Sequence, residues 1–381
     1  MHASTHIKAR TSRETLKHWL FGLLLLSGLI IAALNRSEIE QFADLAHKAQ
    51  PLWLCAAAVL QVGTYFSVAA VWRSALSHTE QPLALLTMVP LAIARHFSDQ
   101  AMPSGGMSGN ALLVSALTHR GIPRPICMAT LLISFVSSFA ADLFAAAVSV
   151  ALLWYFHELQ PWIMIVAIVF AILAVTIPSI ALWIQRRGNN GLPPWLGRVS
   201  KLSKLFGMLG EAPSDLIRNA TVLWTATAFQ LLVILLDTTT LWIMLLAVGQ
   251  QVSIWIALPS FFLASMVAMI VPIPLGLGTF EATCVTVLHL LGVPVAPALT
   301  GTLLFRGFSM WLPMLPGMWI VRRELRITRA SSQRIVDARI LQRQAQDQWE
   351  NEGGGIPAKE PRKNNLDTWR LSKDHEFGMI A

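Results

Sequence analysis

The sequence predicts an all-α polytopic membrane protein with about six full spans and two hairpins that are broken by proline and glycine. Of its 381 residues, 54% are hydrophobic and only 13% are charged, and the mean hydropathy is +0.56. A soluble domain carries roughly a quarter charged residues. Long apolar runs also follow one another with short loops, which favours one membrane domain over several soluble ones. Soluble enzymes and nucleic-acid binders are therefore excluded.

Six apolar runs are long enough for the ~20 residues that cross a bilayer as a helix. They are Leu16–Leu34, Leu52–Leu76, Ile126–Phe156, Trp162–Ile184, Ala220–Val248 and Ala298–Val321. The first run follows a basic arm and looks like a secretory signal. No small-x-small cleavage site follows it and further spans come later, so we expect it to stay as a membrane anchor.

Two other apolar runs are interrupted. Leu83–Thr118 is broken by the sequence MPSGG at 102–106, and Ile254–Leu291 is broken by PIPLGLG at 272–278. Each predicts two short helices around a break, with Pro103, Pro272 and Pro274 as hinges. Lipid cannot satisfy the backbone groups of such a break. The breaks are therefore expected inside the protein or along a wet cavity.

The distribution of basic residues predicts the sidedness. The net charge is +8, and the basic residues lie at the chain ends and between the spans. Such residues favour the cytoplasmic side of a bacterial membrane. We therefore expect the protein in a bacterial inner membrane with both termini in the cytoplasm. The hairpin Leu83–Thr118 then starts and ends inside, and Ile254–Leu291 starts and ends outside, each as two full spans or a re-entrant loop.

The two hairpins resemble each other in opposite orientation. Aligning Pro103 with Pro274 also aligns Gly105 with Gly276. Transporters built from inverted repeats bring such broken helices together near the bilayer midplane. The pattern predicts an inverted repeat; the alternative is coincidence, because proline and glycine are common in membrane helices.

Ionisable side chains inside apolar runs are the candidate functional residues, because each costs at least ~2.5 kcal/mol at the bilayer centre unless it is paired or hydrated. The candidates for substrate binding are Arg306, Glu281 and Arg95. The candidates for coupling are Glu281, Asp237 and Asp142. For the two aspartates the alternative is a structural role, in hydrogen bonds to nearby serine and threonine side chains.

Arg306 lies too far inside the run Ala298–Val321 to reach the membrane surface easily. Its planar guanidinium pairs well with carboxylate and with phosphate, so its partner is Glu281, Asp237 or the phosphate of a substrate. A purely structural Arg306–Glu281 ion pair is the competing interpretation. Glu281 begins a helix, where the dipole favours its charged form, and it either serves function or only caps the helix. Arg95 belongs either to the same anion site or to an interfacial cluster with its ionisable neighbours.

Glycines at the breaks could also take part in binding. They let the backbone approach a ligand closely and expose helix N-terminal amides, which bind anions without any side chain. The candidates are Gly105, Gly106, Gly276 and Gly278. The alternative is a role in helix packing alone.

The sequence shows no familiar catalytic motif. It has no HExxH, GxSxG or Walker-type phosphate-binding pattern. The three cysteines, Cys55, Cys127 and Cys284, lie inside apolar runs without metal-binding spacing. We therefore expect no enzymatic activity, no cofactor and no bound metal.

The composition changes after residue 321 to a mixed-charge, glutamine-rich segment. We expect Arg329–Trp349 to form an amphipathic helix on the anionic cytoplasmic leaflet and residues 351–381 to be disordered. The simpler alternative is a stop-transfer flank followed by a floppy tail. The chain is thus divided into a basic arm (1–15), a transmembrane domain (16–321) and a cytoplasmic tail (322–381).

The second hairpin carries a recognisable signature. The segment IVPIPLGLGTFEA at 270–282, with Gly292-Val293-Pro294, Arg306 and Pro316-Gly317 after it, resembles the flippase-like family of membrane domains. That family includes the transmembrane region of lysylphosphatidylglycerol synthases and hopanoid-associated membrane proteins. The segment MPSGGMSG at 102–109 is similar to the family's other Pro/Gly-rich element. The resemblance covers most of residues 16–321 and implies a membrane domain that acts on lipid.

The first half of the chain departs from that family's pattern. The family commonly has Gly-Glu followed by an arginine in the first hairpin, where this chain has Gly109, Asn110 and Leu113. The acidic–arginine pair of the next helix is replaced by Ser138 and Phe139. Only a short tail follows the membrane region, so we expect no aminoacyl transfer to lipid.

Two functions fit these residues. The first is an inner-membrane translocator of an amphiphilic lipid, anionic or of isoprenoid type, whose headgroup meets Arg306, Glu281 and the glycine breaks. The second is a non-transporting scaffold that holds a lipid-modifying or envelope-assembly enzyme at the cytoplasmic face. In both cases the expected partner is membrane lipid, as substrate or as a surrounding shell, and no nucleic acid.

Overall fold

The computed structural model describes residues 50–77, 79, 83–101, 107–187, 214–217, 219–271 and 278–351. Every regular element in this part of the chain is a helix, which confirms the all-α prediction. The chain divides into two compact units, residues 1–325 and 326–381. The predicted anchor Leu16–Leu34 and residues 352–381 lie outside the described residues.

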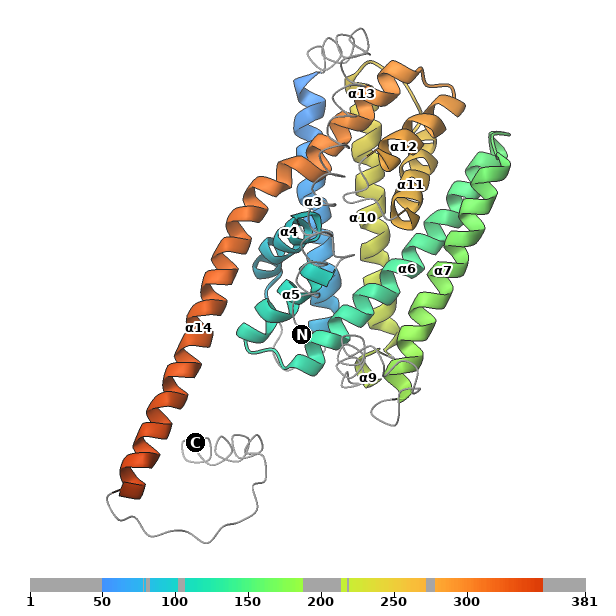
Figure 1. Cartoon of the computed structure of the whole chain (residues 1–381). Helices are drawn as coiled ribbons and strands as arrows, with labels where there is room; N and C mark the ends of the chain where they lie inside the picture. The colour runs from blue at the N-terminus through green and yellow to red at the C-terminus, as the bar shows by residue number, and fades with distance from the viewer. Residues whose placement is uncertain are drawn as a thin grey trace, which may run out of the picture. The chain divides into compact units, whose positions relative to one another are not determined.

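Figure 1 shows the helices of the chain. They are α3 (Pro51–Leu76), α4 (Leu85–Ala101), α5 (Met107–His119), α6 (Arg124–Tyr155), α7 (Pro161–Arg187), α9 (Ser214–Ile217), α10 (Ala220–Ala247), α11 (Ile254–Ile270), α12 (Thr279–Leu290), α13 (Val295–Arg306), the π-helix η2 (Gly307–Trp311) and α14 (Leu312–Asn351). Among the described residues, α3, α6, α7 and α10 are long and apolar enough to cross a membrane. They correspond to four of the six predicted spans.

Local sequence explains where several of these helices start. Pro51 occupies the first turn of α3, where a missing N–H costs nothing. The Asn219 side chain caps α10 by accepting from the backbone N–H of Thr221 at 3.0 Å. Ser253 caps α11 in the same way. Both interrupted runs form two short helices, as predicted: α4 with α5, and α11 with α12.

The predicted single helix Ala298–Val321 is instead divided by the five-residue π-helix η2. In an α-helix the N–H of residue 313 would donate to the carbonyl of Ser309. Residue 313 is proline and has no N–H to give. The turn widens, and the N–H of Leu312 reaches back to the carbonyl of Gly307. Arg306 is therefore the last residue of α13, immediately before an irregular turn, rather than the middle of a regular helix.

Helix α10 is the centre of the bundle. It packs against α3, α6, α11 and α13, and Figure 1 shows it beside α3 along most of its length. Two clusters of buried apolar residues hold the helices together, one around α10–α13 and one around α3–α6. By contrast, Ile165, Ile168 and Ile172 on α7 are more than half exposed. An apolar face of this size suits contact with lipid.

Candidate functional site

A cavity of about 430 Å³ lies among seven helical segments of the first unit, and we call it the charged cavity. Its lining residues come from α3 (Gln61, Thr64, Tyr65, Val68), α4 (Ala92, Arg95, His96, Asp99, Gln100), α10 (Val233, Asp237), α11 (Phe261, Ser265, Ala268), α12 (Phe280), α13 (Phe305, Arg306) and η2 (Ser309, Met310). The fold thus brings Arg95, Asp237 and Arg306 to one place, although they are distant in the sequence.

Arg306 forms an ion pair with Glu281 at the wall of the cavity. Its Nε donates to Oε1 of Glu281 at 2.8 Å, and both side chains are only 13% exposed. The other carboxylate oxygen accepts from the backbone N–H of Gly278 at 2.7 Å. The guanidinium carbon of Arg306 also lies 4.9 Å from the ring centroid of Phe280, at cation–π distance. Glu281 therefore caps α12 and holds Arg306 in one geometry.

Three phenylalanines fix this wall. Phe280 and Phe305 are stacked with their centroids 5.8 Å apart, and Phe261 meets both edge-on. Rings in such arrangements are rigid and exclude water from one side of the ion pair. The Arg306–Glu281 pair consequently has an apolar back and faces the cavity on its other side.

Arg95 on α4 also lines the cavity and has an incomplete set of partners. Its Nε lies 3.7 Å from Oδ2 of Asp99, an ion pair too long for a hydrogen bond. No described residue accepts a hydrogen bond from this buried Nε, and the buried Nε2 of His96 likewise has no partner. The guanidinium of Arg95 also lies 5.7 Å from the ring of Trp72. The guanidinium of Arg95 is therefore held beside Asp99 and Trp72, and the residue lines the charged cavity.

Asp237 receives two neutral donors from α3. Nε2 of Gln61 donates to Oδ1 of Asp237 at 3.0 Å, and the Thr64 hydroxyl donates to the same oxygen at 3.3 Å. The structural alternative for Asp237 expected a serine or threonine neighbour on an adjacent helix, and Thr64 on α3 is such a neighbour. Sequence reasoning missed Gln61 and Thr64, although two polar residues three apart in an apolar run were a usable signal.

The first hairpin closes next to Arg95. The Asp99 carboxylate accepts from the N–H of Gly109 at 2.9 Å, and the Ser108 hydroxyl donates to the carbonyl of Ser98 at 2.8 Å. A Cβ on Gly109 would lie 2.6 Å from both Asp99 oxygens. Glycine is therefore required here, because α5 starts directly against the end of α4.

The remaining predicted site residues lie elsewhere. Asp142 does not line the charged cavity, and its partner is Ser138 on its own helix. Gly278 adopts φ +83°, which favours glycine, and its N–H is taken by Glu281. The break residues Gly105, Gly106, Gly276, Pro103, Pro272 and Pro274 lie outside the described residues. Within the part of the chain that the structure describes, no three His, Cys, Asp or Glu side chains are grouped to hold a metal ion.

These features define an all-helical membrane protein with a charged cavity enclosed by its helices. The chain belongs to the family described as the lysylphosphatidylglycerol synthase TM region, whose sequence model matches residues 19–317. Membership confirms the resemblance of the second hairpin and identifies a membrane protein involved in lipid metabolism or transport. No curated protein matches the chain.

Proposed function

We propose that the protein translocates an amphiphilic lipid with an anionic headgroup, of phospholipid or isoprenoid type, and that the charged cavity receives the headgroup. The observation that carries this proposal is the buried Nε of Arg95, which has no hydrogen-bond acceptor among the described residues. A buried donor without a partner costs about 1–3 kcal/mol. A phosphate oxygen of a bound lipid would remove this cost, while the lipid tails stay in the bilayer.

The Arg306–Glu281 pair forms the second contact of the proposed pathway. Arg306 lines the same cavity as Arg95, and an anion between them would meet both guanidinium groups. Planar guanidinium groups bind phosphate with two parallel hydrogen bonds. In this proposal Glu281 sets the position of Arg306, and no covalent step takes place.

Asp237 is the coupling residue in this proposal. It is the one of the three carboxylate candidates that lines the cavity, whereas Asp142 does not and Glu281 is held by a cation and an amide. The two donors on Asp237 are neutral, so no buried cation fixes its charge. Its carboxylate can therefore respond to a charged headgroup or a proton in the cavity.

We further propose that the two hairpins are re-entrant and form an inverted repeat. Helix α5 has 13 residues and α12 has 12 residues, which gives lengths of about 20 Å and 18 Å. The hydrocarbon core is about 30 Å thick, so neither α5 nor α12 can cross it. Both hairpins contribute to the cavity wall, α4 with Arg95 and α12 with Phe280. Movement of the hairpins would then open the cavity to one side at a time.

The proposed sidedness places both termini in the cytoplasm of a bacterial cell, with the protein in the inner membrane. Arg73 at the end of α3, Arg124 at the start of α6 and Arg187 at the end of α7 would then face the cytoplasm. The opposite ends of these helices carry few basic residues, as the positive-inside rule requires.

The test is lipid movement in vesicles that contain the purified protein. A fluorescent phosphatidylglycerol in the inner leaflet is protected from a membrane-impermeant quencher until it is translocated. The protein should accelerate quenching, and Arg95→Gln should slow it about tenfold or more, since a hydrogen bond to a charged group contributes about 1.5–3 kcal/mol. Arg322→Gln, at an exposed position of α14, is the matched control and should leave the rate unchanged.

Quenching no faster than in protein-free vesicles would contradict the proposal and favour the scaffold function instead. Equal rates for Arg95→Gln and Arg322→Gln would be compatible with translocation but would contradict the role of the charged cavity in it.

A further inference from the structure

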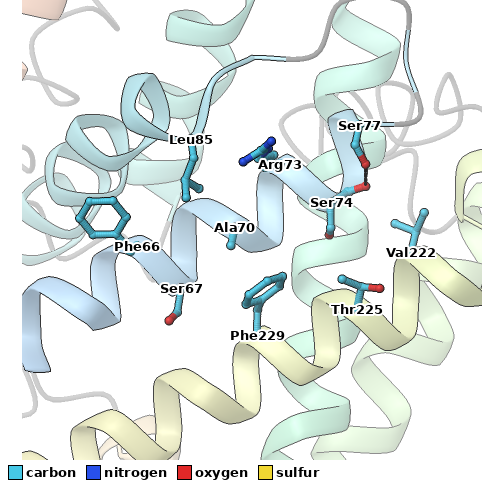
Figure 2. Close-up of a pocket in the computed structure, with 10 residues that line it drawn as sticks. All are labelled: Phe66, Ser67, Ala70, Arg73, Ser74, Ser77, Leu85, Val222, Thr225 and Phe229. Carbon is cyan, nitrogen blue, oxygen red and sulfur yellow. Dashed lines mark hydrogen bonds between the residues drawn. The ribbon is translucent and has the colours of Figure 1, made fainter.

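A second cavity, of about 460 Å³, lies between the last turns of α3, the first turn of α4 and the first turns of α10, and we call it the α3–α10 slot. Figure 2 shows the residues that line it: Phe66, Ser67, Ala70, Arg73, Ser74, Ser77, Leu85, Val222, Thr225 and Phe229. It shares no lining residue with the charged cavity. Ligand sites commonly have volumes of ~300–1,000 Å³.

One end of the slot is apolar. Phe66 and Phe229 are half-buried and stand on either side of a floor that includes Ala70 (Figure 2). Leu85 of α4 adds to the apolar lining, and Val222 adds apolar surface at the other end of the slot, near Ser74 and Thr225 (Figure 2). A cavity lining that includes two aromatic rings, on a protein that spans a membrane, suits a hydrocarbon chain.

At the other end, Arg73 is the one cation among the lining residues that the structure describes. Arg73 is exposed, and no described residue forms an ion pair with it. The hydroxyls of Ser74, Ser77 and Thr225 donate to backbone carbonyls of their own helices. The donors directed at a ligand at this end therefore come from the guanidinium of Arg73.

Helix dipoles do not offset this charge. The C-terminal end of α3 and the N-terminal end of α10 both lie at this end of the slot. Their partial charges have opposite sign and largely cancel. Among the described lining residues, the charge at the rim is therefore that of Arg73, and it favours an anion.

We propose that the α3–α10 slot binds one anionic glycerophospholipid, with its phosphodiester on Arg73 and part of one acyl chain between Phe66 and Phe229. Arg73 and Phe66 are seven residues apart on α3, or about 10 Å along the helix axis. That spacing leads from the headgroup level into the hydrocarbon region. With the sidedness proposed above, the lipid belongs to the cytoplasmic leaflet, and its binding does not require translocation through the charged cavity.

The bound lipid contacts three helices, of which α10 is distant in the sequence from α3 and α4. The slot is lined by α3, α4 and α10, and α4 carries Arg95 of the charged cavity. A lipid in the slot therefore contacts the first hairpin near its beginning. It would act as a structural ligand of the hairpin, distinct from any lipid that is translocated.

The experiment is native mass spectrometry of the full-length protein in detergent, titrated with dioleoyl-phosphatidylglycerol or with dioleoyl-phosphatidylcholine. The wild-type protein should retain one phosphatidylglycerol in preference to phosphatidylcholine. Arg73→Gln should weaken the binding of phosphatidylglycerol about tenfold and abolish the preference, while Arg73→Lys should retain part of it. Arg124→Gln, an equally exposed arginine at the start of α6, is the matched control and should bind like the wild type.

A second variant tests the apolar part independently of charge. Ala70→Phe fills the floor of the slot and should reduce retention of both lipids, whereas Ala147→Phe on the exposed face of α6 should not. Equal retention of the two lipids by the wild type would overturn the proposal. So would identical behaviour of Arg73→Gln and Arg124→Gln, or of Ala70→Phe and the wild type.

Discussion

Replacing Arg306 with leucine removes the cation that neutralises Glu281 inside the bundle. In the structure one oxygen of Glu281 accepts from Arg306 at 2.8 Å and the other accepts from the N–H of Gly278 at 2.7 Å. Both charged side chains are 13% exposed, so water replaces little of what is lost. The variant leaves a carboxylate with one donor in an apolar surrounding.

The expected loss follows from these contacts. Breaking a buried ion pair costs about 3–5 kcal/mol of the free energy of unfolding. Glu281 keeps the Gly278 amide and the favourable end of the α12 dipole, so Arg306→Leu should lie near 3 kcal/mol. Glu281→Gln leaves Arg306 with a weaker acceptor and should cost about 2 kcal/mol. The double variant should lose less than the sum of both, by about 2 kcal/mol, because each single change already breaks the same pair.

The assay is equilibrium unfolding in mixed micelles, in which added SDS denatures the purified protein and the fraction folded is followed. All four proteins of the double-mutant cycle are measured together, with Arg322→Gln as an exposed-arginine control that should match the wild type. If the effects of the two single variants simply add in the double variant, the two residues are not coupled and the described wall of the cavity is refuted.

Other contacts of the charged cavity and its hairpins give further expectations in the same unfolding assay. Gly109→Ala should lower the free energy of unfolding by about 1–3 kcal/mol, because its Cβ would lie 2.6 Å from the Asp99 oxygens. Gln61→Leu should cost about 1–3 kcal/mol by removing a 3.0 Å donor from Asp237. Glu324→Gln should destabilise the protein by about 1–2 kcal/mol, because this buried carboxylate accepts two hydrogen bonds, at 2.7 and 3.1 Å, from Arg120 directly after α5.

Matched control substitutions separate these effects from a general sensitivity of the protein to substitution. Gly63→Ala meets only the methyl groups of Leu236, at 3.5 and 3.8 Å, and should be tolerated. Gln160→Leu replaces a partly exposed glutamine just before α7 and should change little. A Gly109→Ala protein as stable as Gly63→Ala would show that α4 and α5 do not approach as closely as described.

Much of the fold followed from the apolar periodicity and length of the runs. Four predicted spans coincide with α3, α6, α7 and α10 because each is an uninterrupted apolar stretch flanked by caps or prolines. The two interrupted runs could be recognised because proline and glycine cannot continue a helix at low cost. The π-helix after Arg306 was not foreseen: the missing N–H of Pro313 causes it, yet Pro316 in the same run lies inside the α-helix α14, so a proline alone does not predict such a turn.

The partners in the site were only partly predictable. The contact between Arg306 and Glu281 was one of the alternatives, because a buried guanidinium needs an anion. The contact between Asp237 and Gln61 joins residues 176 positions apart, and it depends on the register between α3 and α10. A single sequence does not give that register, so Gln61 and Thr64 stand out as polar residues in an apolar run, but their pairing with Asp237 could not be identified.

The entry of a lipid headgroup into the charged cavity is tested most directly by crosslinking. In a protein whose native cysteines are replaced by alanine, Ser265→Cys places a thiol at the cavity wall, and Ala140→Cys places one on the exposed face of α6. Vesicles containing phosphatidylethanolamine with a maleimide on its amine supply an anionic, thiol-reactive headgroup. We expect Ser265→Cys to form a lipid adduct, detected by mass, and Arg95→Gln to suppress this adduct. Ala140→Cys should react little, because headgroups avoid the hydrocarbon core. No adduct at Ser265→Cys, or an equal yield at both positions, would contradict this expectation.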